Sequence, residues 1–254
     1  MARRITAGSL TKRKNAAFPV LTAYDAAFAP LLEQAGLDCI LVGDSLANVV
    51  LGYASTVNLE LHDMERHCAA VARSTDRAHI VGDLSFGSYE PDDATAVRSS
   101  VRLVQAGANS VKLEGGERIA ARIAAIVAAG IPVMAHIGVT PQTAGLSDGF
   151  RTADDRGRLL ADARAVEAVG AYAVVLEMVE STIAAEITQT LRIPTIGIGS
   201  GPDCDGQVLV LHDLLGLYPN SPPFAKRYAD LGAIVTGAVK AYAADVRERR
   251  FPAR

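Results

Sequence analysis

Residues 38–45 read DCILVGDS, and the pattern of this stretch decides the fold. The run Cys39 to Val42 is short and apolar, as in a buried strand, yet it leads through Gly43 straight into Asp44, whose charge should avoid a core. Four other apolar runs also end in a titratable residue: Asp83, Glu114, His136 and Glu177. Five such endings in register suggest strands that deliver polar side chains to one shared site.

Along the whole chain, apolar runs of this kind predict eight strands, at 18–24, 38–43, 79–83, 110–114, 132–137, 172–177, 194–198 and 207–211. Amphipathic, Ala-rich segments of helical length lie between most of them, at 26–35, 60–73, 92–105, 117–129, 155–169 and 181–191, and a long helix is predicted over 228–249. Glycines follow four of these helices where a left-handed cap is needed: Gly36, Gly107, Gly130 and Gly170.

Near-continuous apolar strands that alternate with helices favour an α/β fold with a parallel sheet covered on both faces. Eight repeats favour a closed (β/α)8 TIM barrel over an open doubly wound sheet, and we predict a single barrel domain over residues 1–254.

Composition excludes several classes of function. The net charge is −3 with no basic stripe, so no nucleic-acid partner is expected. The longest uncharged apolar stretch, residues 123–135, is too short to span a bilayer and contains Gly-Ile-Pro, so no membrane partner is expected either. No secretory signal follows the basic N-terminus, and three scattered cysteines favour a reducing compartment; both indicate a cytoplasmic protein.

In a barrel of this kind the site lies at the carboxyl ends of the strands, where the five titratable residues are predicted. Crowded carboxylates repel one another unless a cation intervenes, and oxygen ligands without a cysteine or multi-histidine cluster point to a hard ion, Mg²⁺. Lys112 precedes Glu114 by two residues and so shares its face of the strand, where it suits a substrate carboxylate or a developing enolate oxygen.

Each of these residues also has a plainer interpretation. A single acid after a strand is commonly a helix cap or a loop ion pair, and His136 alone fits a hydrogen-bonded strand-end histidine. Asp25, after a predicted strand, is a possible sixth member of the set. The glycine-rich loop 197–207 fits anion binding through backbone N–H groups or simple tight-turn geometry, and the sequence leaves both open.

Eight motifs in order resemble the ketopantoate hydroxymethyltransferase family, from about residue 5 to residue 252. They are LTAYD (21–25), ILVGDSL (40–46), VKLEGGE (111–117), HIGVTPQ (136–142), VVLEMV (174–179), IPTIGIGSG (193–201), CDGQVLV (204–210) and FAKRYAD (224–230). The resemblance implies a barrel of the phosphoenolpyruvate/pyruvate superfamily that uses Mg²⁺, with 5,10-methylenetetrahydrofolate as co-substrate. It also implies hydroxymethyl transfer to 3-methyl-2-oxobutanoate through a Mg-stabilised enolate, giving ketopantoate for pantothenate and coenzyme A synthesis.

The resemblance also assigns roles by position. It implies metal binding by Asp44 and Asp83, with Glu114 close to the metal, and a catalytic base at Glu177. It implies that the 2-oxo acid contacts Asp44, Ser45, Asp83 and Lys112, with His136 in the same pocket. A large homo-oligomer, a homodecamer, is implied by the resemblance only.

The chain departs from the family pattern in two places. Ala47 and Asn48 stand where the family usually has Gly-Met, and the predicted lid, residues 145–160, is shorter and carries Asp154 and Asp155. A polar side chain beside the acceptor site would alter which 2-oxo acid fits, or the change is a harmless loop difference, so the acceptor stays open. Because a lid controls water access, the shorter lid leaves the one-carbon donor open. The donor is either the folate itself or formaldehyde released from it.

Three alternatives to the ketopantoate-forming enzyme follow. A paralogous hydroxymethyltransferase or aldolase would act on a different 2-oxo acid. A C–C or P–C lyase of the superfamily is less favoured, because the chain lacks a Lys-Lys-Cys-Gly-His run. A non-catalytic binding barrel would not need Asp44, Asp83, Lys112 and Glu177 together.

Overall fold

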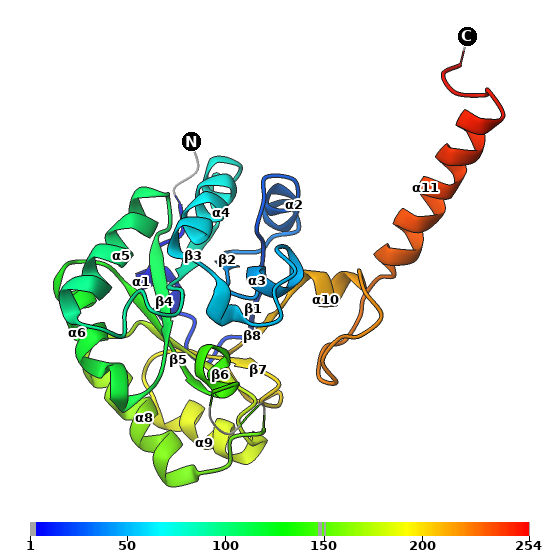
Figure 1. The fold of residues 1–254 in the computed structure, drawn as a ribbon. Helices are drawn as coiled ribbons and strands as arrows, with labels where there is room; N and C mark the ends of the chain where they lie inside the picture. The colour runs from blue at the N-terminus through cyan, green and yellow to red at the C-terminus, as the bar shows by residue number, and fades with distance from the viewer. Residues whose placement is uncertain (1–3, 147–148, 150, 254) are drawn as a thin grey trace. The chain divides into compact units, whose positions relative to one another are not determined.

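The structure is a computed structural model that describes residues 4–146, 149 and 151–253. Its strands form one closed barrel in sequential order, with neighbours paired in parallel (Figure 1). The strands are β1 (Phe18–Thr22), β2 (Cys39–Val42), β3 (His79–Asp83), β4 (Ser110–Glu114), β5 (Val133–Gly138), β6 (Ala173–Glu177), β7 (Thr195–Ile198) and β8 (Gly206–Leu209). The predicted barrel and all eight predicted strands are confirmed.

Helices surround the barrel as the amphipathic segments predict (Figure 1). They are α2 (Ala29–Gln34), α4 (Leu61–Arg73), α5 (Asp93–Gln105), α6 (Ala120–Ala128), α8 (Arg156–Ala168) and α9 (Ser181–Thr190). Shorter elements, which the sequence did not predict separately, are α1 (Ala7–Thr11), α3 (Leu46–Val49), η1 (Thr56–Asn58), η2 (Glu117–Ile119), α7 (Pro141–Ala144) and α10 (Leu211–Leu215).

Local chemistry sets the helix ends. Each of the four predicted cap glycines has a positive φ, between 84° and 108°, which L side chains rarely adopt. Asp155, one of the two unusual acids of the predicted lid, is the N-cap of α8 and accepts a hydrogen bond from the backbone N–H of Arg158 at 3.0 Å. Its presence therefore has a structural explanation.

Aliphatic side chains fill the inside of the barrel, as the scarcity of aromatic residues requires. Leu41, Val81, Met134 and Val175 of four different strands belong to one buried cluster, together with Leu10 of the short helix α1. The amino end of the barrel is therefore filled by α1, and the polar strand ends lie at the opposite, carboxyl end.

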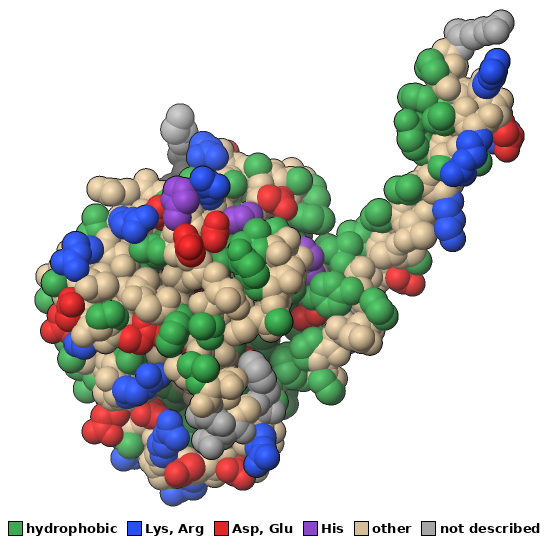
Figure 2. All heavy atoms as spheres, in the orientation of Figure 1, with side chains coloured by type: hydrophobic (Ala, Val, Ile, Leu, Met, Phe, Trp, Pro, Cys, Tyr) green, Lys and Arg blue, Asp and Glu red, His purple; other side chains and the backbone are tan. Residues whose placement is uncertain are grey.

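The chain divides into two compact units, residues 1–208 and 209–254. The second contains α10 and the long helix α11 (Leu231–Arg247), which has no buried residue. Hydrophobic side chains are visible along α11 in Figure 2, and those most exposed include Ile234, Val239 and Tyr242. That both units form a single domain stays a prediction. Over the described ranges, no helix combines the length and apolar character needed to cross a bilayer.

Candidate active site

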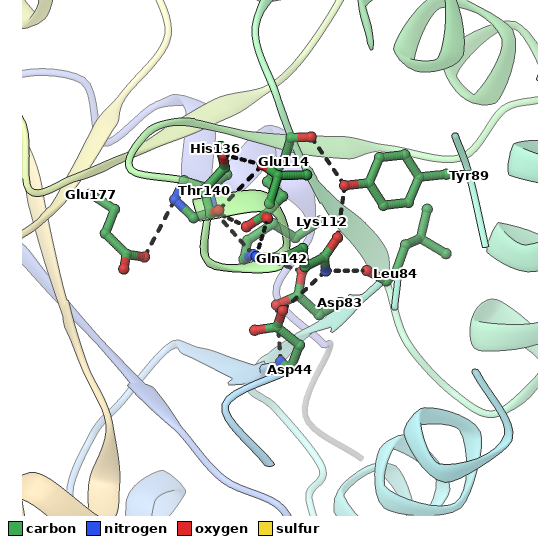
Figure 3. Close-up of polar contacts among 11 residues, drawn as sticks. Asp44, Asp83, Leu84, Tyr89, Lys112, Glu114, His136, Thr140, Gln142 and Glu177 are labelled. Carbon is green, nitrogen blue, oxygen red and sulfur yellow. Dashed lines mark hydrogen bonds and ion pairs between the residues drawn. The ribbon is translucent and has the colours of Figure 1, made fainter. Parts of the chain in front are cut away.

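Five consecutive strands contribute the polar side chains at the carboxyl end of the barrel (Figure 3). Asp83, Glu114 and Glu177 are the last residues of β3, β4 and β6, while Asp44 follows β2 by two residues. Parallel pairing places Asp83 beside Lys112 and Glu114 beside His136. Most of these residues are buried, but the Glu177 side chain keeps 19% of its surface exposed. Glu177 is thus the member of the set that a small molecule reaches most easily.

Asp83 and Lys112 form a buried ion pair, with Nζ 2.7 Å from Oδ1. The other carboxylate oxygen of Asp83 accepts a hydrogen bond from the backbone N–H of Asp44 at 3.1 Å, which holds the two aspartates side by side. Burial and the charge of Asp44 raise the pKa of Asp83 to about 7, although Lys112 opposes the shift. Burial disfavours charge on Lys112, but the surrounding carboxylates outweigh it and raise the pKa of this lysine.

Gln142 joins Asp44 to Glu114, and sequence reasoning did not single it out (Figure 3). Its Nε2 donates to Asp44 Oδ2 at 3.0 Å, while its backbone N–H donates to Glu114 Oε1 at 2.7 Å. Burial, followed by the nearby charge of Asp44, raises the pKa of Glu114 well above its usual range. The motif HIGVTPQ contained the residue, but nothing in its spacing marked Gln142 as a partner of Asp44.

His136 lies between Glu177 and the buried charges of β4. Its Nε2 is 3.4 Å from Glu177 Oε2, and its Nδ1 is 3.4 Å from both Glu114 Oε2 and Lys112 Nζ. Burial and the lysine charge lower the pKa of His136, although Glu177 opposes them. The imidazole is therefore neutral near pH 7, and it separates Glu177 from Lys112.

The backbone around Glu177 is held tightly. Its carbonyl oxygen accepts a hydrogen bond from the N–H of Val139 at 2.9 Å, and a Cβ on Gly138 would lie 2.3 Å from that oxygen. Met178 has a φ of 48°, unusual for a residue with a side chain, and its carbonyl oxygen accepts from the N–H of Ala153 at 2.8 Å. Such a constrained backbone fixes the direction of the Cα–Cβ bond of Glu177.

Other predicted positions have local partners. Ser45 Oγ lies 2.8 Å from Tyr24 OH at the edge of the site. Asn48 is exposed, and its Nδ2 donates to the carbonyl oxygen of Tyr53 at 2.9 Å, which stabilises the loop after β2. Asp25 Oδ1 accepts from two backbone N–H groups just after it, at 2.8 and 2.9 Å, so this acid forms a local turn.

The glycine-rich loop after β7 is held by a serine. Ser200 Oγ donates to the carbonyl oxygen of Leu176 at 2.7 Å and accepts from the N–H of Val179 at 2.9 Å. The flanking Gly199 and Gly201 have φ values of 64° and 79°. These contacts support the tight-turn interpretation of this loop. In the predicted lid, residues 147–148 and 150 lie outside the described residues, so the lid stays a prediction.

The acidic residues fit a divalent cation as a pair rather than as a closed cage. In the part of the chain that the structure describes, no three His, Cys, Asp or Glu side chains are grouped closely enough to hold a metal ion. Mg²⁺, however, commonly takes one or two carboxylates and completes its shell with water and substrate oxygens. Asp44 and Asp83 are adjacent and offer oxygen donors. This donor pair therefore fits Mg²⁺, and the role of Glu114 near the metal stays a prediction.

Solved structures with this fold have little sequence in common with the chain. A phosphonopyruvate hydrolase has a TM-score of 0.66 at 15% identity, covering 96% of this chain and 88% of that one. A 2,3-dimethylmalate lyase, described as a member of the PEP mutase/isocitrate lyase superfamily, has a TM-score of 0.64 at 18% identity, covering 99% and 91%. These likenesses show the fold alone.

Sequence relatives are much closer. The 3-methyl-2-oxobutanoate hydroxymethyltransferase of Ignicoccus hospitalis is 53% identical over 237 residues, covering 92% of this chain and 90% of that protein. The enzyme of the same name from Streptomyces coelicolor is 52% identical over 260 residues, covering 99% and 89%. The family model described as ketopantoate hydroxymethyltransferase matches residues 4–254. Fold, strand-end residues and these matches agree, and the chain belongs to the ketopantoate hydroxymethyltransferase family.

Proposed function

We propose that this protein transfers a hydroxymethyl group to 3-methyl-2-oxobutanoate and so forms ketopantoate for pantothenate and coenzyme A synthesis. The names of relatives at about 50% identity support the proposal. The observation that carries it is the convergence of an aspartate pair, a buried lysine and a reachable glutamate at one end of the barrel.

We propose that Asp44 and Asp83 hold Mg²⁺. When bound there, the ion would polarise the keto group of the 2-oxo acid and make the neighbouring carbon more acidic. A phosphonopyruvate hydrolase of the same fold was crystallised with oxalate and Mg²⁺, which supports a pairing of this ion with a small dicarboxylate at such a site.

Side chains of the protein would carry out substrate binding and proton transfer. Lys112, kept charged by its carboxylate neighbours, would attract the negative oxygens of the 2-oxo acid, with Ser45 at the edge of the same site. Glu177 would accept the proton from C3 of the acceptor, and the electrons of the broken C–H bond would move toward the keto oxygen. Neutral His136, 3.4 Å from Glu177, would keep that carboxylate apart from Lys112.

The one-carbon unit completes the reaction. C3 forms a new bond to the methylene carbon of 5,10-methylenetetrahydrofolate or to formaldehyde released from it. With formaldehyde, the aldehyde oxygen takes up the proton and becomes the new hydroxyl group. With the folate, water supplies the hydroxyl oxygen, both C–N bonds of the methylene carbon break, and tetrahydrofolate leaves after its two nitrogens take up the C3 proton and one proton of the water.

Hydrogen–deuterium exchange at C3 tests the proton-transfer step without the folate. In D₂O with Mg²⁺, the protein should exchange the C3 proton of 3-methyl-2-oxobutanoate, as followed by NMR, and Glu177→Gln should reduce the rate at least about 100-fold. Glu180→Gln is a matched control, because Glu180 lies on the same loop but caps α9 through the N–H groups of Thr182 and Ile183. Exchange that survives in Glu177→Gln would refute the assignment, and exchange only with another 2-oxo acid would favour the paralogous function.

Assembly and location belong to the same proposal. The exposed apolar side chains of α11 are surface that self-association would cover, which supports a homo-oligomer, and the family resemblance suggests a decamer. Light scattering coupled to gel filtration would measure the mass. The three cysteines are free and buried, which suits the reducing cytoplasm proposed as its location.

A further inference from the structure

Both N–H groups and the carbonyl oxygen of the Gln142 amide are hydrogen-bonded. Nε2 donates to Asp44 Oδ2 at 3.0 Å and to the carbonyl oxygen of Leu84 at 2.9 Å, while Oε1 accepts from Tyr89 OH at 2.8 Å. The opposite orientation would place Oε1 against two acceptors, so chemistry alone fixes which end of the amide faces Asp44. The side chain therefore has one orientation and aims a donor at one oxygen of the carboxylate.

Tyr89 holds this orientation by a hydrogen bond to the amide oxygen of Gln142, the end of the amide that does not face Asp44. Its hydroxyl lies 2.8 Å from Gln142 Oε1 and 3.1 Å from the carbonyl oxygen of Glu114, so a single proton serves two acceptors. Both Tyr89 and Gln142 are 1% exposed, and water is not available to replace either contact. The phenol thus links the amide to the end of β4.

The backbone of the same residue engages the second acid. The N–H of Gln142 donates to Glu114 Oε1 at 2.7 Å, and Pro141 at the start of α7 limits how the chain enters this turn. One residue therefore holds two carboxylates that come from different strands, β4 and the end of β2. The bond to Glu114 comes from the backbone, so the contribution specific to the Gln142 side chain is its bond to Asp44.

We propose that Gln142, oriented by Tyr89, is a positioning residue that sets the direction of the Asp44 carboxylate relative to Glu114 and so prepares the site for a divalent cation. The inference rests on the cation site of the proposed function. Outer contacts of this kind commonly contribute about 10- to 100-fold to metal affinity, because they fix the ligand before the ion arrives.

Mn²⁺ binding tests the role without the reaction. The dissociation constant, measured from the electron paramagnetic resonance signal of free Mn²⁺, should rise at least about 10-fold in Gln142→Met, which keeps the length of the side chain but removes all three amide contacts. Tyr89→Phe should raise it severalfold, since Asp44 keeps its donor but the amide loses its support. The KM for 3-methyl-2-oxobutanoate should also rise more in Gln142→Met than in Tyr89→Phe.

Tyr172→Phe is the matched control. Tyr172 OH is also buried and lies 3.0 Å from Ser110 Oγ and 3.3 Å from His79 Nε2, far along the strands from the acids. Its loss should lower the melting temperature about as much as Tyr89→Phe does, with Mn²⁺ affinity changed less than twofold.

The outcomes separate the two proposals. A wild-type protein that binds no Mn²⁺ overturns the cation site, and with it this inference. A wild type that binds Mn²⁺ but transfers no hydroxymethyl group overturns the proposed function alone. Equal affinities in wild type, Gln142→Met and Tyr89→Phe, or an equal loss in Tyr172→Phe, overturn the positioning role. If Gln142→Met fails to fold, Tyr89→Phe against Tyr172→Phe still decides the question.

Discussion

Replacing Lys112 with methionine measures how much this buried positive charge stabilises the carboxylates of the site. Lys112 Nζ lies 2.7 Å from Asp83 Oδ1, and Asp44 and Glu114 are its other charged neighbours. Methionine fills similar space without charge, so the substitution leaves the carboxylates buried and uncompensated. We expect the free energy of unfolding to fall at pH 7.5 in the absence of metal.

The size of the loss follows from the geometry. Two unit charges at 2.7 Å interact by about 6 kcal/mol at an effective dielectric constant of about 20. The cost of burying both charges offsets part of this energy, and removing one partner of a buried pair typically costs about 3–5 kcal/mol. We therefore expect a loss of about 4 kcal/mol.

The loss should depend on pH and on cations. Without Lys112, Asp83 has a stronger tendency to bind a proton, so lowering the pH from 8 to 5.5 should neutralise the buried charge and reduce the deficit by about half. Millimolar Mg²⁺ should also restore stability, and by more in the variant than in wild type, because a cation replaces the missing charge. Urea unfolding followed by circular dichroism measures each value.

Lys14→Met provides the comparison. Lys14 Nζ lies 2.9 Å from Asp205 Oδ2, but this carboxylate also accepts hydrogen bonds from the N–H groups of Asn15 and Thr195. Those contacts outweigh burial and lower the pKa of Asp205, so Asp205 remains stable as an anion. We expect a loss of about 1–2 kcal/mol that neither Mg²⁺ nor mild acid restores. A loss of stability in Lys112→Met that is as small as the loss in Lys14→Met, and that neither Mg²⁺ nor mild acid restores, would refute the reasoning.

Further predictions concern wild-type stability and the backbone at Glu177. Because the folded-state pKa of Asp83 is raised to about 7 from 3.8, the folded protein binds a proton more tightly than the unfolded chain, and metal-free stability should rise as the pH falls from about 8 to about 5 in urea titrations. Gly138→Ala places a Cβ 2.3 Å from the Glu177 carbonyl oxygen and should cost about 2–4 kcal/mol and slow C3 exchange in the NMR assay. Gly107→Ala, whose Cβ would lie 2.4 Å from Ala72 Cβ outside the site, should lower stability in a thermal melt but leave the exchange rate per folded molecule unchanged.

The barrel was predictable because its determinants are local. Each strand is a short apolar run, most helices around the barrel are amphipathic, and the turn after a helix needs a glycine such as Gly36 or Gly170, so nearby residues suffice to place the strands and the long helices. The strand-end acids were predictable for the same reason: once the strands are parallel, the ends meet on one side.

Gln142 and Tyr89 were not predictable, because their partners lie far away in the sequence. Gln142 stands 98 residues from Asp44, inside a four-residue helix with no periodicity to interpret, and Tyr89 lies in a loop. The sequence around a buried amide or phenol does not indicate which acid that group contacts in the folded protein. Asn48 shows the opposite case. Its place in the sequence beside the predicted site suggested a role in substrate specificity, but its amide stabilises the local loop.

The charges at the barrel end are the physical argument for the proposed cation site. Three carboxylates, Asp44, Asp83 and Glu114, surround one buried ammonium group, and neutral His136 adds no positive charge. Lys112 is paired with Asp83, so the uncompensated charge falls on the part of the site where Gln142 donates to Asp44. Burial, and then repulsion between the carboxylates, raise the pKa of Asp83 and Glu114, so a divalent ion bound there would offset the repulsion and would stabilise the folded protein as it prepares the site for a 2-oxo acid.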